Sequence, residues 1–216
     1  MRRTALAAML VIGVLAMVGC GGNGDVAPAV ATVNGEEITE QELDVQLNQY
    51  RQQYASQGMD LDAEPDLLAE VQSDVLNEMI DQKLLLEYAA DEGLTASQEA
   101  MDAEYQALLQ QVGGEETLQE LLDAQGMSRD ELMGLIEDEV MLKYLQDYVR
   151  EERGLEVTEV ALEDAYEQYR EMMPDIPPLD EIRPQLRAEL EHQQYMEVLP
   201  TLLETLREDA EIEVYL

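Results

Sequence analysis

Along most of this chain, apolar residues recur at intervals of three and four positions, which is the spacing of helices that bury one face. Segments 65–91 and 128–153 carry wide apolar faces, so we expect both to lie at the centre of the fold. The proline-rich stretch 174–178 opposes helix formation and predicts a rigid connector. We expect seven helices, near residues 39–57, 65–91, 94–112, 115–125, 128–153, 158–173 and 180–209.

Two regions near opposite ends of the chain show strand patterns instead. Residues 30–33 form a short apolar run before Asn34-Gly35, and a second short run ends at Ile38. Asn-Gly is the strongest two-residue hairpin signal, because both central positions of a type I′ turn need positive φ. A lone hairpin is marginally stable in water and needs a further strand or a helix to pack on. The other candidate strand is 211–216, in which three apolar residues alternate onto one face: Ile212, Val214 and Leu216.

The predicted fold class is therefore mainly α: a multi-helix bundle closed by a small β-sheet that pairs the N-terminal hairpin with the C-terminal strand. Thr39 with Glu42, and Ser128 with Glu131, have the spacing of capping boxes that begin helices. Pro200 removes one hydrogen bond from the last helix, so we expect a bend near Met196.

The first nineteen residues have the pattern of a secretory signal peptide, with Arg2-Arg3 followed by a short apolar run. The segment ending at Cys20 resembles a bacterial lipobox, which implies lipidation of Cys20; the alternative is an ordinary signal peptide with a chance cysteine. Cys20 is the only cysteine, so no intramolecular disulfide is available to it. Residues 20–29 are expected to form a flexible tether, and residues 30–216 one helical domain.

The charge balance excludes one class of partner. The chain has 49 acidic and 12 basic residues and a net charge of −37, which becomes −39 when Arg2 and Arg3 are removed. Nucleic acid is excluded as a partner, because binding it requires Lys and Arg to neutralise phosphates. We interpret the acids as a solvated, self-repelling surface, which would suit a saline habitat; a cation-binding surface is the alternative.

Patterns typical of enzymes and metal sites are weak. His192 is the only histidine and has no cysteine or second histidine for a zinc site. The stretch Asp60–Glu64 resembles a calcium loop faintly but lacks the required glycine and closing glutamate. We expect no catalytic residue, no metal and no cofactor.

Several segments are similar to the N-terminal domain of SurA. They are the Val-Asn-Gly hairpin ahead of a capped helix, Leu85–Ser97 and Leu118–Leu132, and the match covers nearly all of residues 30–152. The final helix and strand, 179–216, resemble the segment that completes this domain in the SurA/PrsA-like family. The resemblance implies a secreted folding factor that holds unfolded polypeptides, often outer-membrane proteins.

Many members of this family also carry a parvulin prolyl-isomerase domain. Its position corresponds here to residues 173–178, whereas a parvulin domain needs roughly a hundred residues. We therefore expect an ATP-independent holdase and not an enzyme. Two alternatives stay open: a prolyl isomerase with an unrecognised active site, and an envelope-assembly lipoprotein dedicated to one partner. Because Gly21 and not Asp follows Cys20, a cell with two membranes would carry the anchor on the periplasmic side of the outer membrane.

Methionine and tyrosine are the candidates for contact with unfolded clients. The chain has ten tyrosines but no Phe and no Trp. Methionine is flexible and fits varied partners, and tyrosine adds contact area while keeping a polar tip. Most of these residues are expected to fill the core. Those outside the main apolar stripes are candidates for client binding: Tyr54, Met59, Met127, Met133, Met172 and Met173.

Overall fold

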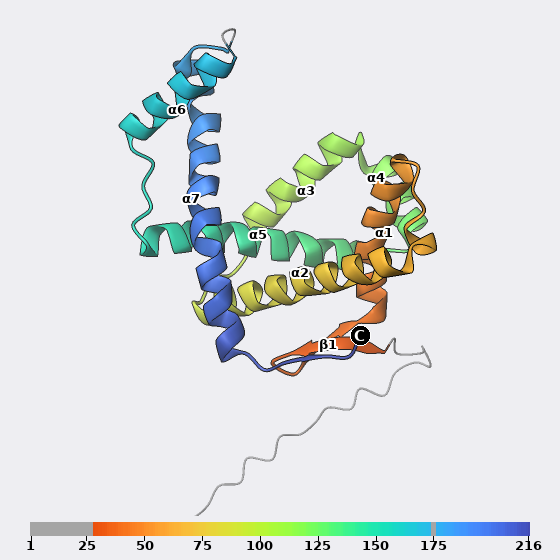
Figure 1. Cartoon of the computed structure of the whole chain (residues 1–216). Helices are drawn as coiled ribbons and strands as arrows, with labels where there is room; N and C mark the ends of the chain where they lie inside the picture. Colours follow the sequence, from red (N-terminus) through yellow and green to blue (C-terminus); the bar gives the residue numbers. More distant parts are fainter. Residues whose placement is uncertain (1–27, 174–175) are drawn as a thin grey trace, which may run out of the picture.

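The computed structural model describes residues 28–173 and 176–216, and within them the chain is mainly helical (Figure 1). The predicted signal peptide, Cys20 and most of the predicted tether lie outside the described residues. The strands are β1 (Ala29–Val33), β2 (Glu36–Thr39) and β3 (Ile212–Val214), and the helices are α1 (Glu40–Ser56), the 3₁₀ helix η1 (Leu61–Ala63), α2 (Pro65–Asp91), α3 (Gln98–Val112), α4 (Glu115–Gln125), α5 (Arg129–Glu152), α6 (Glu159–Met172) and α7 (Leu179–Asp209).

The predicted fold class is confirmed, and the helix boundaries follow the capping residues. Thr39 and Ser128 each accept a hydrogen bond, through the side-chain oxygen, from the backbone N–H of a glutamate three residues later. The carboxylate of that glutamate accepts a hydrogen bond from the backbone N–H of the capping residue. Both predicted capping boxes are therefore present. Helix α3 begins at Gln98, later than the predicted 94, because the Ser97 side chain caps it by accepting from the N–H of Ala100.

The sheet joins the two ends of the domain in the order β2-β1-β3, with both pairs antiparallel. β1 is the central strand, and its Ala31 and Val33 are fully buried. One prediction was wrong in extent: β3 ends at Val214 and not Leu216. Ile212 packs against the core, but Val214 and Leu216 are 55% and 61% exposed, because the helices do not cover this end of the sheet.

Asn34, in the hairpin turn, links the hairpin to both β3 and α2. Its backbone N–H donates to the carbonyl of Glu211 at 2.9 Å, and its Oδ1 accepts from the N–H of Glu211 at 2.9 Å. Its Nδ2 donates to a carboxylate oxygen of Glu87 on α2. Asn34 has a φ of +50°, a conformation that asparagine tolerates better than most residues. One residue thus closes the hairpin and attaches the far end of the chain to it.

Helices α2 and α5 lie at the centre, as their wide apolar faces predict. α2 packs against α1, α5, α7, η1 and β1, and α5 packs against α2, α3 and α7. In the last turn of α7, Arg207 donates to Asp81 of α2 at 2.6 Å and to the carbonyl of Asn77. This pair holds the C-terminal half of α7 on the central helix.

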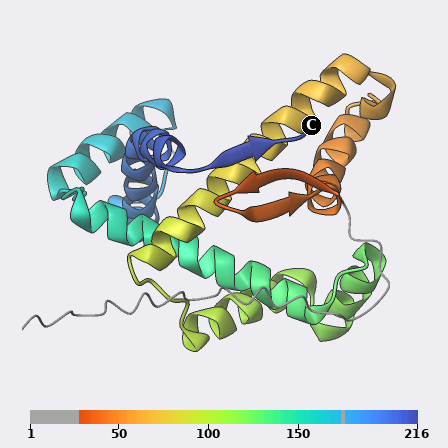
Figure 2. The ribbon, with the colours of Figure 1, turned by 90° about the horizontal axis from the view of Figure 1, so that it is seen from below.

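The core is divided into four apolar clusters, with no buried polar or charged residue among the described residues. The first lies between the sheet, α1 and α2, the second between α2, α5 and α7, and the third between α3, α4 and α5. The fourth joins α6 to the first half of α7 through Val157, Leu162 and Leu186. Figures 1 and 2 show α6 and this half of α7 as an arm that projects from the central helices.

Helix α7 continues through two prolines, Pro184 and Pro200. Neither has an N–H to donate to the carbonyl four residues earlier. The bend expected near Met196 stays a prediction.

The Asn34 link can be tested by substitution. Asn34→Ala removes two side-chain hydrogen bonds and forces an alanine into the left-handed region, so we expect a loss of about 2–3 kcal/mol in unfolding free energy. Urea denaturation followed by circular dichroism measures this loss. Asn34→Gly is the matched control, because glycine adopts positive φ freely and lacks only the side-chain bonds. An equal loss in both variants would show that the conformational term is negligible.

Asp138 of α5 gives a second test, at the junction with α2. Burial raises the pKa of this carboxyl, nearby Glu137 raises it further, and Lys83 of α2 opposes both. A carboxyl whose folded pKa is raised binds its proton more tightly in the folded state, so its contribution to stability is lost as pH rises through that pKa.

We therefore expect Asp138→Asn to unfold at a higher temperature than wild type at about pH 7, with the difference shrinking as pH falls toward about 4, the ordinary aspartate pKa. Thermal melts at the two pH values measure it. Asp164→Asn, on exposed α6, removes the same charge and serves as the control. A constant difference at both pH values would contradict the role given to Asp138.

Candidate functional site

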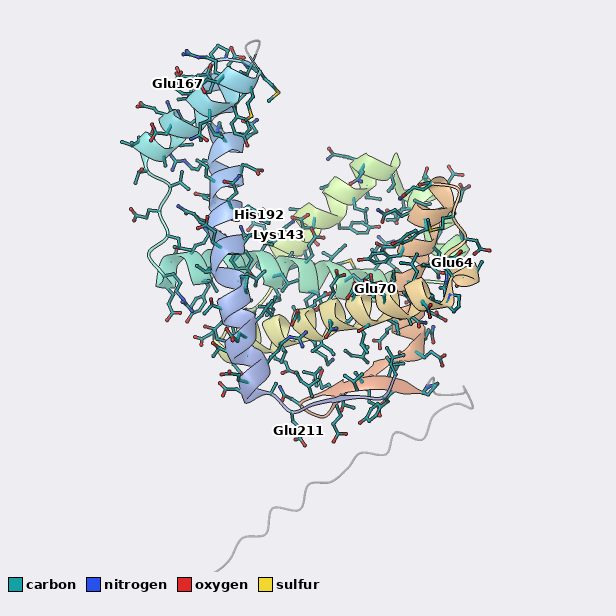
Figure 3. All side chains as sticks on the ribbon, viewed as in Figure 1. Glu64, Glu70, Lys143, Glu167, His192 and Glu211 are labelled. Carbon is teal, nitrogen blue, oxygen red and sulfur yellow. The ribbon has the colours of Figure 1, made fainter. Side chains whose placement is uncertain are left out.

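The charged groups of the described surface are mostly carboxylates, and its few cations are already paired with them. Every lysine and arginine among the described residues except Arg153 forms a salt bridge with at least one carboxylate. Most carboxylates have no such cation. Figure 3 shows the consequence: labelled acids lie on widely separated elements, with Glu64 before α2, Glu167 on α6 and Glu211 before β3.

Large apolar side chains lie exposed within this anionic surface. Their exposed fractions range from 42% to 71%. Single exposed apolar residues are common, so the informative cases are those that are adjacent along the chain. The exposed set in the described residues is Val45, Met59, Leu121, Leu135, Val160, Met172, Met173, Met196, Val214, Tyr215 and Leu216.

Two predicted client-binding residues lie where α1 ends. Tyr54 is half-buried and packs against the first cluster, whereas Met59 is 42% exposed. Met59 lines a shallow depression of about 380 Å³ between the end of α1 and η1, together with Arg51 and Leu61. Arg51 donates to Asp62 at 3.0 Å across this depression, which fixes η1 against α1. Tyr54 and Met59 therefore lie close together, but the side chain of Tyr54 contributes mainly to the core.

The other candidates lie elsewhere. Met127 and Met133 are partly buried and pack against the third cluster at the junction of α4 and α5. Met172 and Met173 are 71% and 56% exposed at the end of α6. The structure therefore places the six predicted residues at three separate positions: the end of α1, the junction of α4 and α5, and the end of α6. Figure 2 shows these segments on different parts of the molecule. It does not bring them into one groove.

The segment Val214–Leu216 is a third exposed apolar position that the sequence pattern did not identify as surface. Its three residues are 52–61% exposed. The alternation of Ile212, Val214 and Leu216 indicates a half-buried strand, but the pattern alone does not show where the covering helices end. Tyr215 lies over the sheet, with its hydroxyl 3.3 Å from that of Thr32 and 2.7 Å from Glu213.

A second depression, of about 520 Å³, lies where the α5–α6 connection meets α7. Arg150 bonds to Asp147 at 3.3 Å and to Glu191 at 2.9 Å, and Arg187 donates to the carbonyl of Val157. Arg187 also bonds to Glu159 at 2.6 Å. The Arg150–Glu191 pair fastens α7 to α5, and the Arg187 bonds join α7 to the α5–α6 connection and to α6.

The residues considered for metal binding are dispersed. His192 is exposed on α7, and Figure 3 shows it on a different helix from Lys143 of α5. Asp60 caps η1 by accepting from the N–H of Asp62 at 3.2 Å. Within the described residues, no group of three or more His, Cys, Asp or Glu side chains is placed to hold a metal ion.

Hydrogen bonds to carboxylates, together with burial, raise the pKa of two tyrosine hydroxyls. The hydroxyl of Tyr148 donates to Glu92 at 2.5 Å, and this bond together with burial raises the pKa of Tyr148 to about 12. Burial raises the pKa of Tyr105, whose hydroxyl donates to Glu115 at 2.9 Å. These phenols remain protonated near neutral pH and act as hydrogen-bond donors that join neighbouring helices.

Comparison with known proteins supports one family. A family model described as "SurA-like N-terminal domain" matches residues 1–149, which is more than half of the chain. No curated protein matches the chain. None of the helices in the described residues combines the length and apolar character needed to cross a membrane.

Proposed function

The chain belongs to the SurA-like N-terminal domain family, and on that premise we propose that it is an extracytoplasmic, ATP-independent chaperone that holds unfolded polypeptides. The observation that carries the proposal is the combination of this family domain with large apolar side chains left exposed on an anionic surface. Family members are folding factors, so exposed apolar residues have a ready interpretation as contacts for unfolded chains.

The proposed mechanism is reversible contact without chemistry. Met172 and Met173 on the arm, Met59 at the end of α1, and Val214–Leu216 at the sheet would each cover a short apolar stretch of a client. Separate shallow contacts suit an extended, unfolded chain that spans more than one of them. The net charge of −37 would keep the complexes apart from one another and soluble.

The cellular setting is part of the proposal. We propose lipidation at Cys20 and attachment to the periplasmic face of a membrane, with unfolded or outer-membrane proteins as clients. Labelling of expressing cells with a clickable palmitate analogue should mark the wild-type chain and not Cys20→Ser. Equal labelling of both would exclude Cys20 as the lipidated residue.

Holdase activity predicts suppression of aggregation. A denatured outer-membrane-type protein diluted into buffer should scatter less light when residues 21–216 are present at a near-stoichiometric ratio. The assay is run at low and at molar salt, because salt screens the self-repulsion of so acidic a domain. A folded, helical domain that leaves scattering unchanged at both salt concentrations contradicts a general chaperone.

The residues are tested in the same assay. The double substitution Met172→Ser, Met173→Ser should weaken suppression about two- to fivefold while leaving the thermal melt unchanged, because both side chains are exposed. Val45→Ser, at an isolated exposed position on α1, is the control and should have no effect. Two further outcomes identify the alternatives: catalysis of a proline-limited refolding reaction indicates an isomerase, and capture of one stoichiometric envelope partner indicates a dedicated assembly protein.

A further inference from the structure

The β3 strand forms one edge of the sheet, and its register shows which backbone groups face outward. Asn34 donates its N–H to the carbonyl of Glu211, and Tyr215 donates its N–H to the carbonyl of Val30, both at 2.9 Å. Backbone groups alternate in direction along a strand, so residues 211, 213 and 215 bond toward β1. The N–H and C=O groups of Ile212 and Val214 are therefore directed away from the sheet, along an edge with which no other strand of the described residues pairs.

The two edges of the sheet differ in how they are protected. Edge strands are usually protected by charge, proline, a bulge or a covering element. The β2 edge presents Glu37, and the irregularity in pairing lies on this side, between Ala29 and Ala31. The β3 edge carries one charged residue, Glu213, but has no proline, no lysine and no such irregularity among the described residues. It is the less protected of the two.

An added strand would also cover apolar side chains that are now exposed. Val214 pairs with Ala31, so its side chain lies on the same face of the sheet as the buried Ala31. Val214 is nevertheless 55% exposed, and Leu216 beside it is 61% exposed. A strand placed next to β3 would continue the apolar face of the sheet and shield both side chains.

The charges near this edge determine which segment it fits. Glu208, Asp209, Glu211 and Glu213 lie within six residues of Val214. The one arginine of this region, Arg207, is already paired with Asp81. An incoming segment with lysine or arginine would meet uncompensated carboxylates, whereas a second copy of this chain would bring a net charge of −37 against the same surface.

We propose that the free edge of β3 binds a basic, extended segment of the client as a fourth strand, in which apolar residues alternate with lysine or arginine. This inference rests on the proposed holdase function and adds to it the class of client segment. Backbone bonds to Ile212 and Val214 supply the pairing, Val214 and Leu216 contact the apolar residues of the segment, and the surrounding carboxylates favour its cations.

The test uses labelled peptides of about ten residues and the folded domain of residues 21–216. One peptide alternates lysine with valine, and its partner alternates glutamate with valine. Val214→Pro removes the outward N–H of Val214 without touching the bonds of Glu211 and Tyr215 to β1. Glu37→Pro is the matched control, because Glu37 occupies the equivalent outward position on the β2 edge.

Fluorescence anisotropy should show that the lysine peptide binds and that the glutamate peptide binds at least about tenfold more weakly. Val214→Pro should weaken binding of the lysine peptide about tenfold, whereas Glu37→Pro should leave it within about twofold of wild type. Val214→Thr keeps the N–H and should lose less affinity than Val214→Pro, even if the proline variant is less stable. The proposal is overturned by equal affinity for both peptides, by unchanged binding in Val214→Pro, or by sedimentation showing a dimer that Val214→Pro dissociates.

Failure of the proposed function is distinguishable from failure of this inference. Peptide binding lost in Val214→Pro, in a domain that does not suppress aggregation, supports the basic-segment site and contradicts the holdase. Suppression of aggregation that is unchanged in Val214→Pro, with no peptide binding to wild type, supports the holdase and overturns the site.

Discussion

The pairing of β1 with β3 is the interaction on which the rest of the fold depends. It joins residue 33 to residue 212 and so closes a chain in which α2 and α5 connect the intervening helices. Asn34 makes this closure specific, since its side chain bonds to Glu211 and Glu87 at once. The Arg207–Asp81 pair then holds the end of α7 on α2. Without the strand pairing, α7 would keep its contacts with α2, α5 and α6 but would lose the sheet that directs its end.

The second constraint is the balance between a divided core and an acidic surface. Four separate clusters stabilise the described part of the chain, and no single core joins all of its elements. The carboxylates outnumber the cations, and most have none to pair with, so compaction works against self-repulsion. Helix caps, the Tyr105–Glu115–Arg129 group and the Arg150 pairs bind elements together locally. This arrangement leaves apolar residues at the ends of elements, where no neighbour covers them.

Much of the fold follows from local signals in the sequence. Thr39, Ser128 and the Asn34-Gly35 turn specify helix starts and the hairpin through bonds within a few residues, and each lies where the sequence predicts it. The extent of burial does not follow in this way. Val214 and Met127 are both apolar, yet Val214 is exposed and Met127 packs against the third cluster. That difference depends on where distant helices end, which local periodicity does not encode.

The most direct test of the account is hydrogen–deuterium exchange of the domain with and without an unfolded client. Outward backbone groups of Ile212 and Val214 exchange freely at an open edge and are protected when a strand is added. The account predicts client-dependent protection at residues 212–216 and around Met172, with the central helices α2 and α5 unchanged. Exchange that is identical with and without the client would contradict it.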